Sequence, residues 1–530
     1  MDIHRANDHA GTVHLHHVPL PGETTEEKEI QVVMHDEQLP SNEVIHKTKS
    51  GAVYKTRNGL ELIPTPSNDP NDPLNWPFMW KMSVLICVCL SSLMVAFSAA
   101  GIIPGFTEIA EAYHTSINRV AYLVSVHVLW LALGPIIWSA LCDTYGRRPV
   151  YLASMLIQTV ASIGCAKAPS YGVQIFTRML QGFGASGSIA VGAGSIADIF
   201  FLHERGLYNG IWIWIAQSGP FVAPMVTGIL IQETNWRWSL WLMAILCGAI
   251  LVVCFFFLPE TLYIRNLEDV DHIPTGEEVK HRKRLFAQTS FGRISPRPLD
   301  FIEFFRPLYM LRYPSVGLMA LAWMAGVAMP DIGISNIIPL AYGGVYGWGP
   351  AGQGYANAGF LVGSFLGEVT AGNVSDFYIR WRVRKNGGVF VPEMRLHCMI
   401  PGLIIMPFAL AGFGATIQHK THWMGPTAMM ALTIFGYQQL VSLGMAYGID
   451  CYKPQAPYVA AAMVFCRQLF GFTVNYWLLP WVENSGFQNS YIAQGAVLAV
   501  FGCGPVVLLM IWGQKWRERA PVPHGFGTSQ

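Results

Sequence analysis

Charged residues are scarce in this 530-residue sequence. Asp, Glu, Lys and Arg together make up 13% of it, whereas soluble domains average about 25%. Hydrophobic residues make up 52%, and the mean hydropathy is +0.35. This balance excludes an ordinary soluble domain and predicts a protein whose main partner is the lipid bilayer. The formal net charge of +1 gives no large basic surface, so no nucleic-acid partner is expected.

Motifs of metal binding, disulfide pairing and hydrolysis are also missing. The ten cysteines lie in apolar runs or at their ends, without paired metal-ligand spacing. We therefore expect no metal, no cofactor and no disulfide framework. The apolar runs contain neither H-E-x-x-H nor G-x-S-x-G, so an enzyme is the least favoured class. The first apolar run starts near Met82, so no signal peptide is predicted.

What the sequence does have is a series of apolar runs long enough to cross a bilayer, which takes about 20 residues each. Residues 1–78 are polar and predicted to be a disordered cytoplasmic tail. Twelve predicted spans follow, at 82–103, 118–142, 149–167, 173–200, 207–231, 236–258, 313–342, 351–374, 397–417, 422–446, 457–481 and 489–512. The fold class expected is therefore an all-α membrane protein with twelve transmembrane helices.

Lys and Arg are distributed unevenly between the two sides of this layout. The segments placed inside carry most of them, including the run from Arg380 to Arg395, whereas the outward loops hold only Arg119, Lys167, Arg237 and Lys420. This asymmetry predicts that both termini are cytoplasmic. The expected units are residues 79–258 as a first six-helix lobe, 259–311 as a cytoplasmic loop, 312–514 as a second lobe, and 515–530 as a cytoplasmic tail.

The two predicted halves repeat the same pattern of polar residues. Three correspondences carry this repeat: Gly134, Asp143 and Arg147 with Gly367-Glu368, Asp376 and Arg380; Asp198 with Asp450; and Gln217 with Arg467. A six-plus-six repeat with a long central loop is typical of two-lobed transporters, whose binding site lies between the lobes near the middle of the membrane.

The turn between predicted spans two and three contains Asp143, Gly146, Arg147 and Arg148 in the spacing D-x-x-G-R-R. So short a charged turn must lie at the bilayer surface. It either fixes orientation only or acts as a hinge latched by charge pairs. The spacing resembles the loop signature between spans two and three of the major facilitator superfamily, although Ser139 stands where that family often has Gly.

The fourth predicted span resembles the same superfamily through the sequence R-x-x-Q-G-x-G, which begins at Arg178. Its glycines permit close helix packing, but packing does not explain a charged residue inside a span. In the superfamily this Arg is linked to proton coupling, and the resemblance implies that role for Arg178. The alternative is an Arg whose side chain reaches the outer interface.

The fifth predicted span contains Gly219-Pro220 and Pro224, which are expected to kink it. This segment resembles the G-P-x-x-G-P signature of proton-driven antiporters, with Ala223 in place of the second Gly. The signature is associated with export, and a merely kinked structural helix is the alternative.

The region from Val374 to Leu396, with Leu366-Gly367-Glu368 before it, resembles spans eight and nine of fungal multidrug-type proton antiporters. The overall resemblance covers about residues 70–516. It implies the major facilitator fold, with two six-helix lobes that alternate access to a central cavity.

Polar and aromatic residues inside the predicted spans are the candidates for the site. His127 and Asp331 suit proton transfer and, with Arg178, form the expected proton-coupling set; a histidine bonded to a neighbouring helix and a carboxylate in an outer vestibule are the alternatives. Glu368 and Asp376 are expected to act in gating with the D-x-x-G-R-R residues. The expected substrate-binding residues are His127, Trp130, Trp214, Gln217, Asp331, Gln438, Arg467 and Asn475.

These observations favour a monomeric secondary transporter in the plasma membrane, with a vacuolar or vesicular membrane as the alternative. We expect it to export a small organic compound, such as a drug, toxin or secondary metabolite, in exchange for protons. Two alternatives stay open: a proton-coupled importer of a polyamine, nutrient or iron chelate, and a receptor that binds its ligand without transporting it.

Overall fold

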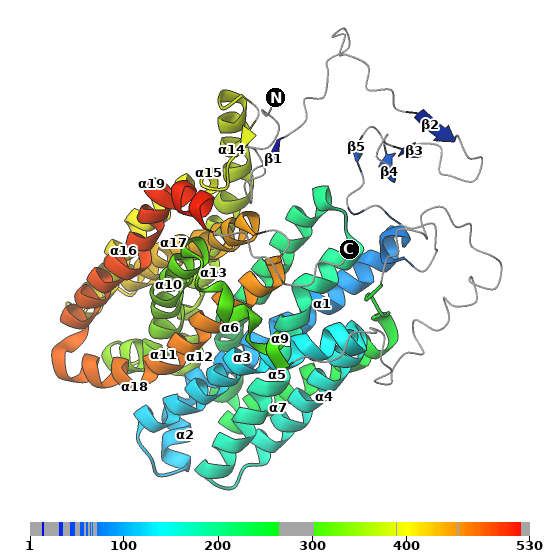
Figure 1. Cartoon of the computed structure of the whole chain (residues 1–530). Coiled ribbons are helices and arrows are strands. Elements are labelled where there is room, and N and C mark those ends of the chain that lie inside the picture. Colours follow the sequence, from blue (N-terminus) through cyan, green and yellow to red (C-terminus); the bar gives the residue numbers. More distant parts are fainter. Residues whose placement is uncertain are drawn as a thin grey trace.

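The computed structural model describes residues 72–263, 301–387, 389–452 and 455–520, with short stretches of residues 13–66. Most of the tail predicted for residues 1–78, residues 264–300 of the central loop and the predicted tail beyond residue 520 lie outside the described residues. In the described part, the chain forms a long bundle of helices (Figure 1).

The first half of the bundle, which we call the first lobe, contains six long helices. Two short helical turns, η1 (Pro73–Asn75) and η2 (Ile103–Gly105), and the short helix α2 (Phe106–Ala112) accompany them. The long helices are α1 (Phe78–Ala100), α3 (Ile117–Tyr145), α4 (Arg147–Lys167), α5 (Tyr171–Ile199), α6 (Leu202–Glu233) and α7 (Trp236–Phe257). They follow the first six predicted spans closely, because apolar runs of membrane length fold as helices in lipid.

In the second half of the bundle, which we call the second lobe, some spans are divided into several shorter helical pieces. It begins with α9 (Phe301–Met310), and its predicted seventh span is built from α10 (Pro314–Ala328), η5 (Met329–Gly333), α11 (Ile334–Ile338) and η6 (Pro339–Val345). The predicted eighth span is α12 (Pro350–Ala356), α13 (Ala358–Val369), η7 (Thr370–Val374) and α14 (Ser375–Lys385). The remaining helices are α15 (Met394–His397), α16 (Ile400–Gln418), α17 (Met424–Cys451), α18 (Ala456–Val497), η9 (Leu498–Cys503) and α19 (Gly504–Arg519).

Nine helical stretches within the described residues are long and apolar enough to cross a membrane. One of them, Tyr458–Arg519, holds two predicted spans, which meet at Gly486. That residue has a φ of 76°, a conformation that glycine adopts without steric strain. The predicted fourth span is α5, whose many Gly and Ser residues lower its hydropathy, and the predicted eighth span is interrupted at Asn357. All twelve predicted spans are therefore present as helical segments.

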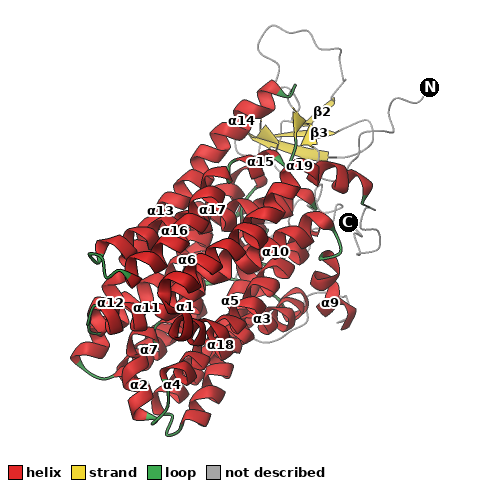
Figure 2. Ribbon diagram, turned by 90° about the vertical axis from the view of Figure 1, so that its left-hand side faces the viewer, coloured by secondary structure: helices red, strands yellow, loops and turns green. Residues whose placement is uncertain are grey.

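Short strands lie outside the bundle (Figure 2). Four of them form an antiparallel sheet in the order β2 (Gln31–Met34), β3 (Glu43–Lys47), β4 (Val53–Arg57) and β5 (Leu60–Glu61). Strand β1 (Val13–His14) pairs with β6 (Val389–Phe390), which precedes α15. The segment predicted to be a disordered tail thus contains strands, while the part that fits a membrane is helical.

The two lobes meet mainly along three pairs of helices, α3 with α18, α6 with α12, and α6 with α13. At the second pair the backbones nearly touch: a Cβ on Gly228 would collide with the carbonyl oxygen of Pro350, and one on Gly354 with that of Pro224. The hydrophobic core continues across the third pair, where Phe221 of α6 stacks on Phe360 of α13 with ring centroids 4.8 Å apart.

Candidate functional site

A buried acid and a buried arginine form an ion pair in the second lobe. Asp331 lies in the π-helical turn η5 directly after Pro330, whose missing N–H and bulky ring disturb regular α-helical bonding. Arg467 projects from α18, and its Nη2 lies 3.0 Å from Asp331 Oδ2. The side chain of Asp331 is 6% exposed and that of Arg467 is 12% exposed. So little contact with water makes the pair sensitive to any change of charge.

Tyr437 and Gln217 extend this pair across the lobe boundary. The Tyr437 hydroxyl on α17 donates to Asp331 Oδ2 at 3.2 Å and accepts from Gln217 Nε2 at 2.6 Å. Arg467 Nη1 also donates to Gln217 Oε1 at 3.4 Å. Because Gln217 lies on α6 of the first lobe, the network joins the two lobes near their centre. Sequence inspection did not single out Tyr437, whose only signal was a polar group beside the Gln438-Gln439 pair.

A second buried arginine, Arg178, lies within the first lobe and has neutral partners. Its Nη1 donates to the carbonyl oxygen of Ser98 at 2.6 Å and to Gln181 Oε1 at 2.7 Å. Gln181 in turn donates to Ser162 Oγ on α4 at 2.8 Å. Arg178 is fully buried and does not reach an interface, and among the described residues it forms no ion pair.

His127 and Trp130 face the interior of the first lobe rather than the Asp331–Arg467 pair. His127 is fully buried, and its Nε2 lies 3.4 Å from the hydroxyl oxygen of Ser98, which connects it indirectly to Arg178. Trp130 packs edge-on against Phe183 of α5, with ring centroids 5.7 Å apart. The structure therefore brings His127 near Arg178 and leaves both away from the second-lobe network.

Asn475 forms a direct bridge between the lobes. Its Nδ2 donates to Ser125 Oγ at 2.9 Å and to the carbonyl oxygen of Ala121 at 3.2 Å, both on α3. Its Oδ1 accepts a hydrogen bond from Asn336 of α11 at 2.8 Å. The residue is 1% exposed. Further along the same seam Tyr122 stacks on a tyrosine of α18 at 4.5 Å, so this half of the lobe boundary is closed.

Glu368 and Gln438 are paired within the second lobe. Gln438 Nε2 donates to Glu368 Oε2 at 2.8 Å, and Ser442 Oγ donates to the same oxygen at 2.5 Å. Trp214 of α6 approaches from the other lobe and meets Phe365 edge-on, with ring centroids 6.0 Å apart. These residues lie at the α6–α13 contact, apart from the Asn475 seam.

The turn predicted to act as a latch forms a network inside the first lobe, at what we call the basic end of the bundle. Gly146 has a φ of 104°, which few residues other than glycine adopt. Arg147 Nη1 lies 2.7 Å from Asp143 Oδ1, and its Nε lies 3.2 Å from Oδ2 of Asp198, where α5 ends. These contacts do not cross to the second lobe, so in this conformation the residues stabilise one lobe.

Glu260 completes this network. Its carboxylate accepts hydrogen bonds from the backbone N–H groups of Arg147 at 2.8 Å and Arg148 at 3.1 Å, where α4 begins. Negative charge is favourable at a helix N-terminus. Burial nevertheless raises the pKa of the Glu260 carboxyl, and the three backbone N–H groups that it binds partly offset that rise. The Arg148 guanidinium donates to the carbonyl oxygen of Phe255 at 2.7 Å, which ties α4 to α7.

The corresponding network in the second lobe uses a different arginine from the one expected. The repeat pairs Arg147 with Arg380, but within the described residues Arg380 donates only to the backbone oxygen of Asp376. Arg395, which precedes α16, instead lies 2.6 Å from Asp450 Oδ2 and occupies the role that Arg147 has toward Asp198. The difference follows from the longer connection between α13 and α16, in which α14 carries Arg380 away from the end of α17.

The helix α6 remains continuous through the residues expected to kink it. It runs from Leu202 to Glu233 with Pro220 and Pro224 inside. Gly219 serves close packing, since a Cβ there would lie 2.6 Å from the carbonyl oxygen of Leu93 on α1.

A family model described as Major Facilitator Superfamily matches residues 88–475, from α1 of the first lobe into α18 of the second. The match contains Gln217, Asp331, Tyr437 and Arg467, which we call the central network. This chain belongs to the Major Facilitator Superfamily. It is therefore a multi-pass membrane transporter and not an enzyme.

Curated members of the Major Facilitator Superfamily resemble this chain over most of its length. The MFS-type transporter penM of Penicillium rubens is 29% identical over 468 residues, which cover 85% of this chain and 88% of that protein. Fluconazole resistance protein 1 of Saccharomyces cerevisiae is 28% identical over 446 residues, covering 82% and 79%. Efflux pump radE of Floropilus chiversii is 26% identical over 512 residues, covering 93% of each.

Solved structures of the superfamily share the fold. The xylose transporter XylE from E. coli, in a partially occluded inward-open conformation, aligns with a TM-score of 0.56 and 14% identity, covering 85% of this chain and 100% of that one. At this identity the similarity supports the fold alone.

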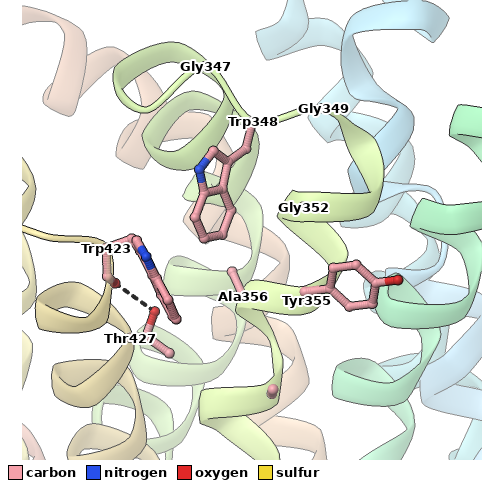
Figure 3. Close-up of a pocket in the computed structure, with 9 residues that line it drawn as sticks. Gly347, Trp348, Gly349, Gly352, Tyr355, Ala356, Trp423 and Thr427 are labelled. Carbon is pink, nitrogen blue, oxygen red and sulfur yellow. Dashed lines mark hydrogen bonds between the residues drawn. The ribbon is translucent and has the colours of Figure 1, made fainter.

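A hollow with a volume of about 570 Å³ lies at the end of the bundle opposite the basic end. Figure 3 shows Trp348, Trp423 and Tyr355 around it, and Thr427 donates to the backbone oxygen of Trp423 at 2.9 Å. It is built from the loop before α12, α12 itself and the start of α17. None of the predicted site residues lines it, so it is separate from the central network of this transporter.

Proposed function

We propose that this chain exports a small organic compound, such as a drug, toxin or secondary metabolite, in exchange for protons. The names of two relatives, an efflux pump and a fluconazole resistance protein, support export. We also propose that it works as a monomer in the plasma membrane with both termini in the cytoplasm, which agrees with the distribution of Lys and Arg.

The observation that carries proton coupling is the Asp331–Arg467 pair and its link to Gln217 of the other lobe. Ionised Asp331 holds Arg467 in place. Protonation removes the negative charge, which ends the ion pair and frees Arg467 to move. Because Tyr437 and Arg467 both bond to Gln217, the same event weakens a contact between the lobes. A proton on Asp331 would thus change how firmly the lobes hold together at their centre.

The described conformation fits one state of an alternating-access cycle. The contacts made by Asn475, Tyr122 and the α6–α12 glycines close the lobes at the end opposite the basic residues. With the basic end in the cytoplasm, this is the state closed to the outside. We propose that Asn475 acts in this closure, that Gln217 and Arg467 contact substrate, and that the Asp143–Arg147–Asp198 network keeps the first lobe rigid as it moves.

Transport by the purified full-length protein in proteoliposomes tests this function. Radiolabelled fluconazole should accumulate against its gradient when the proton gradient runs in the opposite direction, and a protonophore should abolish accumulation. Asp331→Asn should keep fluconazole exchange but lose accumulation driven by the proton gradient. Glu518→Gln, on the exposed face of α19, serves as the matched control.

Three outcomes would contradict the proposal. Accumulation that a protonophore leaves unchanged would remove proton coupling. Accumulation in the same direction as proton flow would indicate an importer. Binding of fluconazole without any flux would indicate a receptor.

A further inference from the structure

Glu368 is a carboxylate at the lobe boundary, and in the part of the chain that the structure describes no cation neutralises it. It lies on α13, and Oε2 is bonded to Gln438 and Ser442 of its own lobe. Both partners are neutral donors. Across the described ranges, Glu368 takes part in no ion pair with Lys, Arg or His.

The second carboxylate oxygen faces the opposite lobe across a glycine. A Cβ built on Gly210 of α6 would lie 3.7 Å from Glu368 Oε1. Because residue 210 is a glycine, α6 places no side chain at this position against Glu368 Oε1. A gating ion pair would need a cation at this position of α6, and the chain provides none.

Aromatic rings lie one helical turn away on both helices. Trp214 follows Gly210 by four residues on α6, and Phe365 precedes Glu368 by three residues on α13, which places each ring on the same face as its partner. The two rings meet edge-on with centroids 6.0 Å apart. Rings beside a carboxylate favour an organic cation, since the carboxylate attracts the charge and the ring faces attract both the charge and an apolar body.

The buried carboxylate of the lobe boundary, Asp331, does not offer such a site. Asp331 is neutralised by Arg467 at 3.0 Å. When both acids are ionised, the two carboxylates and the one guanidinium leave a single negative charge, which belongs to Glu368. Glu368 is partly buried, and even partial burial of a charge without a counter-ion is unfavourable, so a bound cation would lower that cost.

We propose that Glu368 binds the positive group of a lipophilic organic cation, with Trp214 and Phe365 against its apolar body. This assignment names a substrate class for the proposed transporter and therefore rests on that function. The carboxylate holds either the cation or a proton, so release of one accompanies uptake of the other.

Equilibrium binding to the detergent-purified full-length protein tests the assignment without any gradient. The probes are rhodamine 6G, a lipophilic cation, and Nile red, a neutral dye, both followed by fluorescence anisotropy. Glu368→Gln should weaken rhodamine 6G binding at least ~10-fold while leaving Nile red binding unchanged, because a tenfold loss is the size expected from one lost charge contact. Glu368→Asp should recover part of the affinity, and the exposed Glu518→Gln variant should bind both dyes like the wild type.

The unchanged Nile red binding also establishes that Glu368→Gln is folded. Equal loss of both dyes would overturn the assignment in favour of a purely structural role, and so would unchanged rhodamine 6G binding. Failure of the wild-type protein to bind rhodamine 6G would overturn it as well. Because no gradient is present, a selective loss in Glu368→Gln stands even if fluconazole transport proves independent of protons.

Discussion

The two lobes each bury an arginine, but they hold it in opposite ways. Arg178 of the first lobe donates to neutral oxygens of Ser98 and Gln181, all within that lobe. Arg467 of the second lobe is paired with a carboxylate and reaches Gln217 in the other lobe. Amide and carbonyl oxygens do not titrate in the pH range where proteins work, whereas a carboxylate is a titratable group. The difference predicts that the second lobe responds to protonation. It also predicts that the hydrogen bonds around Arg178 hold α1, α4 and α5 of the first lobe together.

The largest expected effect comes from breaking the charged pair on one side. Arg467→Ala leaves Asp331 buried without its counter-ion and should lower the free energy of unfolding by about 3–5 kcal/mol. Chemical denaturation of the detergent-purified protein measures this. The double variant Asp331→Asn with Arg467→Met should recover most of the loss, because no unpaired charge is left. If Arg467→Ala were as stable as the wild type, the Asp331–Arg467 pair would be solvated, and the contrast drawn here with Arg178 would not hold.

A smaller effect is expected at the other arginine. Arg178→Met leaves only neutral acceptors unsatisfied and should destabilise the protein by about 1–3 kcal/mol. The pH profile of fluconazole transport should keep its shape in this variant, while Asp331→Glu should shift it. The opposite result would be a pH dependence of transport that Arg178→Met abolishes and Asp331→Glu leaves unchanged. It would place proton coupling in the first lobe, where His127 is the nearby titratable residue.

Gln217→Ala removes the hydrogen bonds that connect the first lobe to Tyr437 and Arg467 of the second lobe. Loss of its bonds to Tyr437 and Arg467 should shift the equilibrium between closed and separated lobes by about 0.5–1.5 kcal/mol toward separation. Spin labels at positions 118 and 483, whose side chains lie 3.5 Å apart across the seam, report the separated population in a background without the native cysteines. Gln514→Ala, which alters an exposed glutamine of α19, is the control. An unchanged distance distribution would mean that Gln217 does not help to hold the lobes.

The smallest effect is expected at the basic end. Asp143→Asn removes an ion pair whose acid side chain is 65% exposed, and pairs of that kind contribute about 0–1 kcal/mol. Asp198, with 22% of its side chain exposed, should matter more when changed to Asn. Denaturation midpoints of the two variants provide the test, and a larger loss from Asp143→Asn would contradict the geometry.

The sequence predicted the helices well because lipid leaves a chain few alternatives. The runs of apolar residues mark all twelve spans, and α3, α4 and α7 begin and end close to the predicted residues. The irregular turns were harder. The π-helical turn at Asp331 and the break at Asn357 depend on how neighbouring helices pack, which no local pattern records.

The candidate site could be predicted only in part. Polar residues inside apolar runs pointed to Asp331 and Arg467, but not to the fact that they form a pair, since they lie 136 residues apart in the chain. Tyr437 was missed because tyrosine is common in membrane helices and carries no charge. Arg395 was missed because the repeat was aligned by spacing, and the extra length of α14 changes the register.

The glycine contacts between α6 and α12 also bear on the speed of the transport cycle. Main-chain atoms of the two halves rest directly on one another at Gly228 and Gly354. At these two positions no side chain stands between the main chains, so no rotamer there has to change before the halves separate. Substitution of either glycine by a larger residue should therefore force α6 and α12 apart at this end of the bundle and hinder the contact from forming again once the halves have separated.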